Sequence, residues 1–140
     1  MRKIKFGVVG GGGAFYFHAN GIRGSEILEY TAIYDINYEN AKRMAQKYKN
    51  NPMTAYENLD DMLDSDIDAV LVMVPHVYHD NIVVQCAEKG KHVLCEKPIA
   101  SSAQELERMM KAADGNGKIL LEAMRPVFDP GFAKIKELLG

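Results

Sequence analysis

The sequence predicts an α/β protein with a doubly wound parallel sheet, in which helices flank the sheet as three α/β/α layers. Three observations predict this fold. The hydrophobic period alternates between two and about 3.6 along the 140 residues, which indicates strands and helices in turn. Residues 69–74 are apolar throughout, as expected of a strand buried on both faces. Four glycines follow the first strand, and right-handed crossovers then give the strand order 3-2-1-4-5-6.

Six short segments have the pattern of strands, and a helical segment separates each from the next. The predicted strands cover residues 3–9, 28–34, 53–56, 69–74, 92–95 and 118–122. In a sheet of this kind, ligands bind at the carboxyl ends of the strands, where the strand order reverses. We therefore look for chemistry among the residues that follow each strand.

The helices between these strands are predicted from apolar spacing and from capping residues. The first is expected over residues 14–23, a brief one is expected to present Leu59, Met62 and Leu63, and another is expected over 78–89. Asn37 can cap the helix that carries apolar side chains at i, i+3, i+4 and i+7. Ser102 and Glu105 form a capping box, and Asp129 with Pro130 opens a last helix that runs to the end.

The composition is that of a single globular domain. Hydrophobic residues make up 47% and charged residues 26%, which excludes a disordered or fibrous chain. With a net charge of -2 and no long basic run, the chain lacks the signature of a nucleic-acid binder. Its apolar runs are too short for a membrane helix, and its start lacks a cleavage site. Cys86 and Cys95 fit a reducing compartment, so we expect a cytoplasmic protein.

The glycines at 10–13 lie where a backbone must approach a pyrophosphate closely and offer N–H groups at a helix N-terminus. Gly10 and Gly12 satisfy the first half of the GxGxxG pattern, and the third fingerprint position falls on Phe15 instead of glycine or alanine. We predict that Gly10, Gly12, Gly13, Ala14 and Phe15 contact a dinucleotide. Glycines in an ordinary tight turn are the alternative reading.

Asp35 closes the second strand, 25 residues after Gly10, near the spacing at which a carboxylate binds the ribose hydroxyls of adenosine. A 2′-phosphate beside that carboxylate would meet like charge, at a cost of roughly 4 kcal/mol at an effective dielectric of about 20. We therefore predict NAD as the cofactor, with NADP as the alternative. Lys42 and Arg43 lie on the next helix and could bend inward to reverse this preference.

The sequence "CEKP" follows the fifth strand and brings an acid, a base and proline to the same edge as the glycines. Proline fixes the direction of the departing chain, and Glu96 can orient and neutralise Lys97. The Lys97 ammonium could then stabilise a substrate oxygen that gains charge. A surface ion pair is the alternative reading.

Together these segments resemble the glucose-fructose oxidoreductase and inositol dehydrogenase family, known as Gfo/Idh/MocA. The resemblance covers residues 4–139 and is carried by "GVVGGGG", His18, Asp35, "DAVLVMVPHVYH", "GKHVLCEKP" and "EAMRPVFDP". It implies an NAD(P)-binding Rossmann domain over residues 1–125 and, over 126–140, the start of a connection to a substrate domain. It also implies oxidation or reduction of a sugar, polyol or cyclitol, with Lys97 reaching the substrate beside the nicotinamide.

Further site residues follow from this resemblance. Pro75, His76, His79 and Glu96 are expected near the nicotinamide end, although family members usually have asparagine where this chain has His76. Relatives are more than twice as long, and their second domain carries the aspartate and histidine of proton transfer. We therefore expect these residues alone to bind dinucleotide but to turn over little. Self-association is expected only of the full-length protein.

Other sites are disfavoured, and two rival functions stay open. His76 and His79 could hold zinc, but no further ligand stands at a suitable spacing, so no metal is predicted. His18 and His92 are expected to be structural, and Arg125 could reach toward the active site. The rivals are a non-catalytic nucleotide sensor and a methyltransferase with a similar glycine loop; the Glu-Lys-Pro turn argues against the second.

Overall fold

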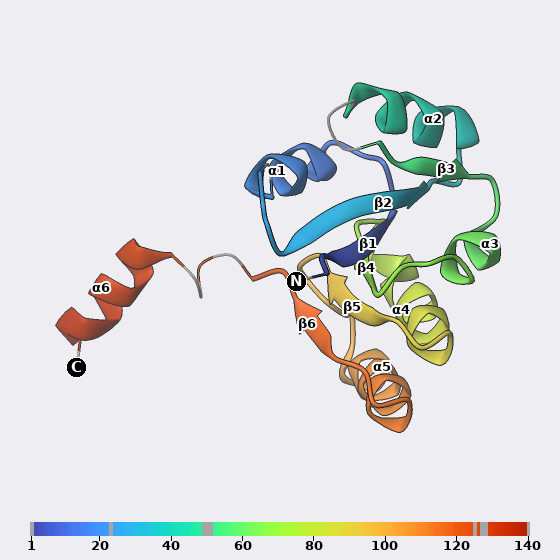
Figure 1. The fold of residues 1–140 in the computed structure, drawn as a ribbon. Helices are drawn as coiled ribbons and strands as arrows, with labels where there is room; N and C mark the ends of the chain where they lie inside the picture. Colours follow the sequence, from blue (N-terminus) through green and yellow to red (C-terminus); the bar gives the residue numbers. More distant parts are fainter. Residues whose placement is uncertain (1, 23, 49–51, 125, 127–128, 140) are drawn as a thin grey trace.

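The computed structural model describes residues 2–22, 24–48, 52–124, 126 and 129–139. Six parallel strands form one sheet in the order β3-β2-β1-β4-β5-β6, as predicted (Figure 1). The strands are β1 (Ile4–Val9), β2 (Leu28–Tyr34), β3 (Thr54–Tyr56), β4 (Ala69–Val72), β5 (His92–Cys95) and β6 (Leu120–Glu122). The order reverses between β1 and β4, so the carboxyl ends of these two strands mark the expected ligand edge.

The helices follow the predicted alternation closely. They are α1 (Ala14–Gly21), α2 (Tyr38–Lys47), α3 (Leu59–Leu63), α4 (His79–Glu88), α5 (Ala103–Gly115) and α6 (Pro130–Leu139), with a 3₁₀ turn, η1 (His76–Tyr78), before α4. One half of the predicted capping box is present, since Ser102 Oγ accepts from the N–H of Glu105. The Glu105 carboxylate accepts from the N–H of Ser101.

The two faces of the sheet carry separate hydrophobic clusters, which confirms the three-layer arrangement. On one face α1 and α2 pack through Phe15, Ala41 and Met44 against strand residues that include Val8 and Leu71. On the other face α3, α4 and α5 pack against the intervening strand residues through the buried side chains Met62, Leu63, Val83, Cys86 and Met109. Alternate residues of β1 and β4 face opposite layers, so both central strands are buried on two sides.

Several element ends differ from the sequence-based expectation. β4 ends at Val72 instead of residue 74, because the chain then turns toward Pro75, which has no N–H to donate to a ladder. The first helix ends at Gly21, and Arg23, within its predicted span, lies outside the described residues. Asn37 occupies the N-cap of α2, but its side chain makes no capping bond; instead its N–H donates to Asp35 at 2.9 Å.

The last helix stands apart from the sheet (Figure 1). Its apolar residues Phe132, Ile135, Leu138 and Leu139 are exposed. Among the described residues, no helix combines the length and the apolar character needed to cross a membrane.

Candidate functional site

The chain makes a tight turn at Gly10, where β1 ends. Gly10 has φ +97°, a conformation that other residues rarely adopt, and a Cβ there would lie 2.7 Å from the carbonyl oxygen of Met73. Its N–H donates to the carbonyl of Tyr34 at 2.9 Å. The turn is thus held between the ends of β2 and β4, and only glycine fits it.

The next residues leave space above the backbone. A Cβ on Gly12 or Gly13 would meet nothing within 4 Å, and both residues are exposed. Gly13 is the N-cap of α1, so Gly13 and Ala14 carry N–H groups at the positive end of that helix. An anion could approach this backbone closely, as the sequence predicts for a pyrophosphate.

Phe15 differs from the other residues predicted to contact the cofactor. Its side chain is fully buried and makes edge-on contacts with Tyr30 and Tyr48, at centroid distances of 5.2 and 5.0 Å. The aromatic ring therefore anchors α1 to the sheet, a position at which the fingerprint normally has a small residue. Because the Phe15 side chain is buried, only its backbone is available to a ligand on the loop, and the predicted contact of Phe15 with a dinucleotide stays a prediction.

Asp35 braces the glycine turn from the end of β2. One carboxylate oxygen accepts from the N–H of Gly11 at 2.7 Å and from the side chain of Asn40 at 2.8 Å. The other accepts from the N–H of Asn37 at 2.9 Å. A carboxylate offers about four acceptor positions, so these three bonds leave one for a ligand hydroxyl.

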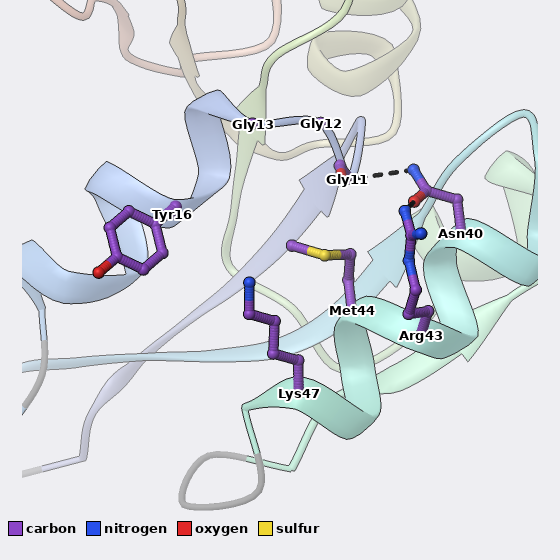
Figure 2. A pocket seen from close by; sticks show the side chains of 8 residues that line it. All are labelled: Gly11, Gly12, Gly13, Tyr16, Asn40, Arg43, Met44 and Lys47. Atoms are coloured by element: carbon purple, nitrogen blue, oxygen red, sulfur yellow. Dashed lines mark hydrogen bonds between the residues drawn. The ribbon is translucent and has the colours of Figure 1, made fainter.

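A pocket of about 480 Å³ lies between the glycine loop and α2 (Figure 2). It is lined by Gly11, Gly12, Gly13, Tyr16, Asn40, Arg43, Met44 and Lys47. In Figure 2, Asn40 bonds to the Gly11 carbonyl from α2, and Lys47 points toward the space between α2 and the loop. The Arg43 guanidinium donates to the Asn40 side chain. The pocket therefore combines backbone N–H groups with two cations beside the carboxylate of Asp35.

Of the two cations that the sequence suggested could bend inward, only one lines the pocket. Arg43 does so, whereas Lys42 pairs with Glu39 at 2.5 Å and lies over the ring of Tyr38. Lys47 and Asn40 were missed by the sequence reasoning. The sequence spacing could have predicted them, because Asn40, Met44 and Lys47 are spaced i, i+4 and i+7 and so lie on one face of α2.

The second part of the site follows β5. The Glu96 carboxylate bonds to His18 Nε2 on α1 at 2.6 Å and accepts from the N–H of Lys97 at 3.1 Å. Burial alone would raise the pKa of Glu96, but these bonds outweigh it and lower the pKa. Glu96 was expected to orient and neutralise Lys97; its hydrogen bonds go to the Lys97 N–H and to His18, and the Lys97 charge helps to lower its pKa. Lys97 itself is exposed.

The segment after β4 completes this edge. Pro75 and His76 are exposed, as a ligand contact would require. His79 is fully buried and bonds to carbonyl oxygens of Val74, Pro98 and Ile99. The His79 ring is therefore packed and hydrogen-bonded inside this edge, and its expected place near the nicotinamide end stays a prediction.

The remaining candidate residues are the possible metal ligands, Arg125, His18 and His92. Within the part of the chain that the structure describes, no three His, Cys, Asp or Glu side chains are grouped to hold a metal ion. Arg125 lies outside the described residues. His18 joins two parts of the site, and His92 accepts from the N–H of Ile119 at the opposite end of β5.

Known proteins match both the sequence and the fold. A family model described as GFO_IDH_MocA, oxidoreductase family, NAD-binding Rossmann fold, matches residues 4–124. A scyllo-inositol 2-dehydrogenase (NADP(+)) of Bacillus subtilis is 41% identical over 115 residues, which cover 81% of this chain and 34% of that protein. A myo-inositol 2-dehydrogenase of Thermotoga maritima is 30% identical over 96% of this chain and 40% of that protein.

The structural likeness is as extensive. The 3-ketoreductase KijD10 from Actinomadura kijaniata, solved in complex with TDP-benzene and NADP, superposes with a TM-score of 0.91 and 26% identity. The match covers 99% of this chain and 43% of that chain. The chain thus spans less than half the length of each of these three proteins.

Proposed function

The chain belongs to the Gfo/Idh/MocA oxidoreductase family, and from this premise we propose that it is the cofactor-binding part of an NAD(P)-dependent dehydrogenase or reductase. The reaction would move a hydride between the nicotinamide and a hydroxyl- or keto-bearing carbon. A sugar, a cyclitol or a related compound is the proposed substrate, since relatives are named for inositols and a solved neighbour is a ketoreductase.

One observation carries this proposal: the glycine turn and the Glu-Lys-Pro segment lie at the same edge of the sheet and are linked through the first helix, α1. His18, on the helix that the glycine loop opens, bonds to Glu96, the neighbour of Lys97, at 2.6 Å. A ligand on the loop would therefore extend toward Lys97. The open space above Gly12 and Gly13 fits a pyrophosphate, and the free acceptor position of Asp35 fits a ribose hydroxyl.

Lys97 is the proposed catalytic residue of this chain. Its exposed ammonium can donate a hydrogen bond to the substrate oxygen and stabilise the charge that develops there. Glu96 bonds to the Lys97 N–H and thus fixes the backbone from which that side chain extends. The nicotinamide, when bound, supplies or accepts the hydride.

Among the other predicted contacts, the backbone of Gly10, Gly12, Gly13, Ala14 and Phe15 would face the pyrophosphate, and Pro75 and His76 the nicotinamide end. NAD is the proposed cofactor because of the negative charge of Asp35. Arg43 and Lys47 oppose this preference, and NADP appears in the names of one relative and one neighbour. NADP therefore remains the alternative.

The rest of the enzyme would complete the site. We propose that residues 1–125 form the dinucleotide-binding domain and that 126–140 begin the connection to a substrate domain, since α6 stands apart with its apolar residues exposed. Groups beyond these residues would move the proton and select the substrate. The free buried cysteines Cys86 and Cys95 fit a cytoplasmic protein.

Titration of the purified chain with NADH, NADPH and S-adenosylmethionine, followed by melting temperature, tests the proposal. We expect a saturable rise with NADH, of the size that mass action gives for a ligand of the native state. Stabilisation by S-adenosylmethionine alone would make the chain a methyltransferase domain and end the oxidoreductase assignment. The sensor alternative binds dinucleotide equally well, so it needs a kinetic test.

That test is Lys97→Ala in a catalytically active form of the protein. We expect kcat to fall about 10²- to 10³-fold, as when one donor to a developing oxyanion is lost, with little change in dinucleotide affinity. Wild-type turnover in this variant would exclude the catalytic role of Lys97. No turnover with any polyol or sugar, despite tight NADH binding, would favour the sensor.

A further inference from the structure

His79 is the one fully buried imidazole among the described residues, and the proposed reaction does not use it. His79 is the first residue of α4, and its ring lies between two segments of the site. Its Nε2 is 2.9 Å from the carbonyl oxygen of Val74, which follows β4. Its Nδ1 is 3.0 Å from the carbonyl oxygen of Pro98 and 3.2 Å from that of Ile99.

The chemistry of these contacts restricts the state of the ring. Carbonyl oxygens only accept hydrogen bonds, so each contact needs an N–H on the imidazole. A neutral imidazole has a single N–H, and its other nitrogen would present a lone pair to a carbonyl oxygen at bonding distance. An imidazolium has two N–H groups and satisfies both sides.

The surroundings contain charges of both signs. On α4 itself, the neighbouring Asp80 is bonded to Arg108 of α5, so its charge is already compensated. From the turn before α4, the ring of His76 lies 5.4 Å away. Glu122 of β6 accepts from the N–H of Ile99, the residue whose carbonyl faces the ring.

The remaining groups are Cys95, the last residue of β5, and Glu96 and Lys97, which follow it. The Cys95 thiol lies 4.0 Å from the carbonyl of Ile99, and burial raises its pKa to about 12, so it stays neutral. The Glu96 carboxylate and the Lys97 ammonium are of opposite charge. Three carbonyl oxygens face the two nitrogens of the buried His79 ring.

We propose that His79 is a positioning residue whose imidazole, protonated on both ring nitrogens, ties the turn after Lys97 to the segment that follows β4. The bridge fixes the backbone on the carboxyl side of Lys97, while Glu96 fixes it at the lysine N–H. Together they hold Lys97 in place from both sides. This role rests on the proposed function, because a fixed position of Lys97 matters only if Lys97 acts on the substrate.

The protonation state can be read directly from ring ¹H–¹⁵N spectra of the wild-type chain at neutral pH without any ligand. We expect both ring nitrogens of His79 to carry a proton. His92 is an internal control, because its Nδ1 accepts from the N–H of Ile119 at 3.1 Å and must be unprotonated. A single protonated nitrogen on His79 would overturn the proposal, whatever the chain binds.

A variant tests the consequence for Lys97. In His79→Gln one side chain cannot donate to both segments, so we expect the amide signals of Lys97 and Ile99 to shift or broaden. We also expect the NADH-induced shift at Lys97 to be lost while that at Gly12 persists. The matched control, His92→Gln, should leave both signals unchanged. An unchanged Lys97 in a folded His79→Gln chain would contradict the positioning role.

Two results separate this inference from the proposed function. If NADH shifts no signal in the wild-type chain, the function is wrong while the ring spectrum still decides the state of His79. If NADH binds and His79 carries one proton, the positioning role is wrong and the function stands. If His79→Gln fails to fold, the wild-type spectrum remains the deciding measurement.

Discussion

At the scale of single residues, the Asp35 carboxylate braces the glycine turn and is the group that we propose selects the cofactor. Three protein donors hold it against the glycine turn, including the N–H of Gly11 and the side chain of Asn40. Its negative charge then lies beside a pocket with Arg43 and Lys47. We propose that the choice between NAD and NADP depends on the balance of these three charges, because a 2′-phosphate there would be repelled by one and attracted by the other two.

We therefore predict that Asp35→Asn raises the affinity for NADPH relative to NADH by at least about tenfold, which is 1.4 kcal/mol. Asparagine keeps an oxygen for the Gly11 N–H and removes the charge. Calorimetric titration with both dinucleotides measures the ratio. Arg43→Gln is the matched control, since it should move the ratio in the opposite direction. An unchanged ratio in both variants would show that the 2′ position lies elsewhere.

Two glycines of the turn are needed for different reasons: Gly10 for its backbone conformation and Gly12 for the proposed contact with the ligand. Gly10→Ala should lower the free energy of unfolding by about 1–3 kcal/mol, because φ is +97° and the new methyl group meets the Met73 carbonyl at 2.7 Å. Gly12→Ala has open space, so we expect near-native stability but weaker NADH binding. Urea denaturation and NADH titration of both variants measure the two effects. Equal stability losses would contradict this division.

At the scale of secondary-structure elements, α5 illustrates how one helix face attaches to the sheet. Met109 is fully buried in the cluster beneath α4 and α5, whereas its neighbour Met110 is half exposed. We predict that Met109→Ala costs about 2–5 kcal/mol in the free energy of unfolding, the range for truncated core side chains. Met110→Ala should change it by less than about 0.5 kcal/mol. Similar losses in both would mean that α5 is rotated about its axis.

The elements that the sequence predicted well are those with strong periodicity or a cap. The strand order follows from alternating elements and right-handed crossovers, and the α5 cap from Ser102 and Glu105. Asn37 was predicted to cap α2 with its side chain, and it does occupy the N-cap position. Its side chain makes no capping bond, whereas its backbone N–H donates to the Asp35 carboxylate. Local pattern fixes elements better than it fixes the partners of a polar side chain.

The site was predicted in part for the same reason. Residues that end strands, such as Asp35 and Lys97, could be placed at one edge from topology alone. The burial of His79 and Phe15 could not, because it depends on which neighbours fill the space around each ring. Likewise, the bond between His18 and Glu96 joins residues 78 positions apart, and no spacing rule reports such a contact.

At the scale of the whole molecule, stability should fall steeply in alkaline solution. Burial raises the pKa of Cys86 and of Cys95 to about 12 from the ordinary value of 9.0, and it also raises the pKa of Tyr30. Between those two values the unfolded chain has lost thiol protons that the folded chain retains. The unfolded state therefore binds fewer protons in this range. The stabilising contribution of the thiols is complete below about pH 9, and the free energy of unfolding falls as the pH rises toward about 12.

Each thiol contributes about 1.4 kcal/mol per pH unit to this slope. We predict that Cys86→Ala makes the slope shallower by about that amount between pH 9 and 12, as measured by urea denaturation across the range. Val83→Ala is the matched control: Val83 is buried on the same helix and does not titrate, so its loss should lower stability at every pH and leave the slope intact. Because both truncations remove core volume, only the slope reports the thiol. An unaltered slope in Cys86→Ala would mean that this thiol titrates alike in the folded and unfolded chains, and hence that water reaches the layer between α4 and the sheet.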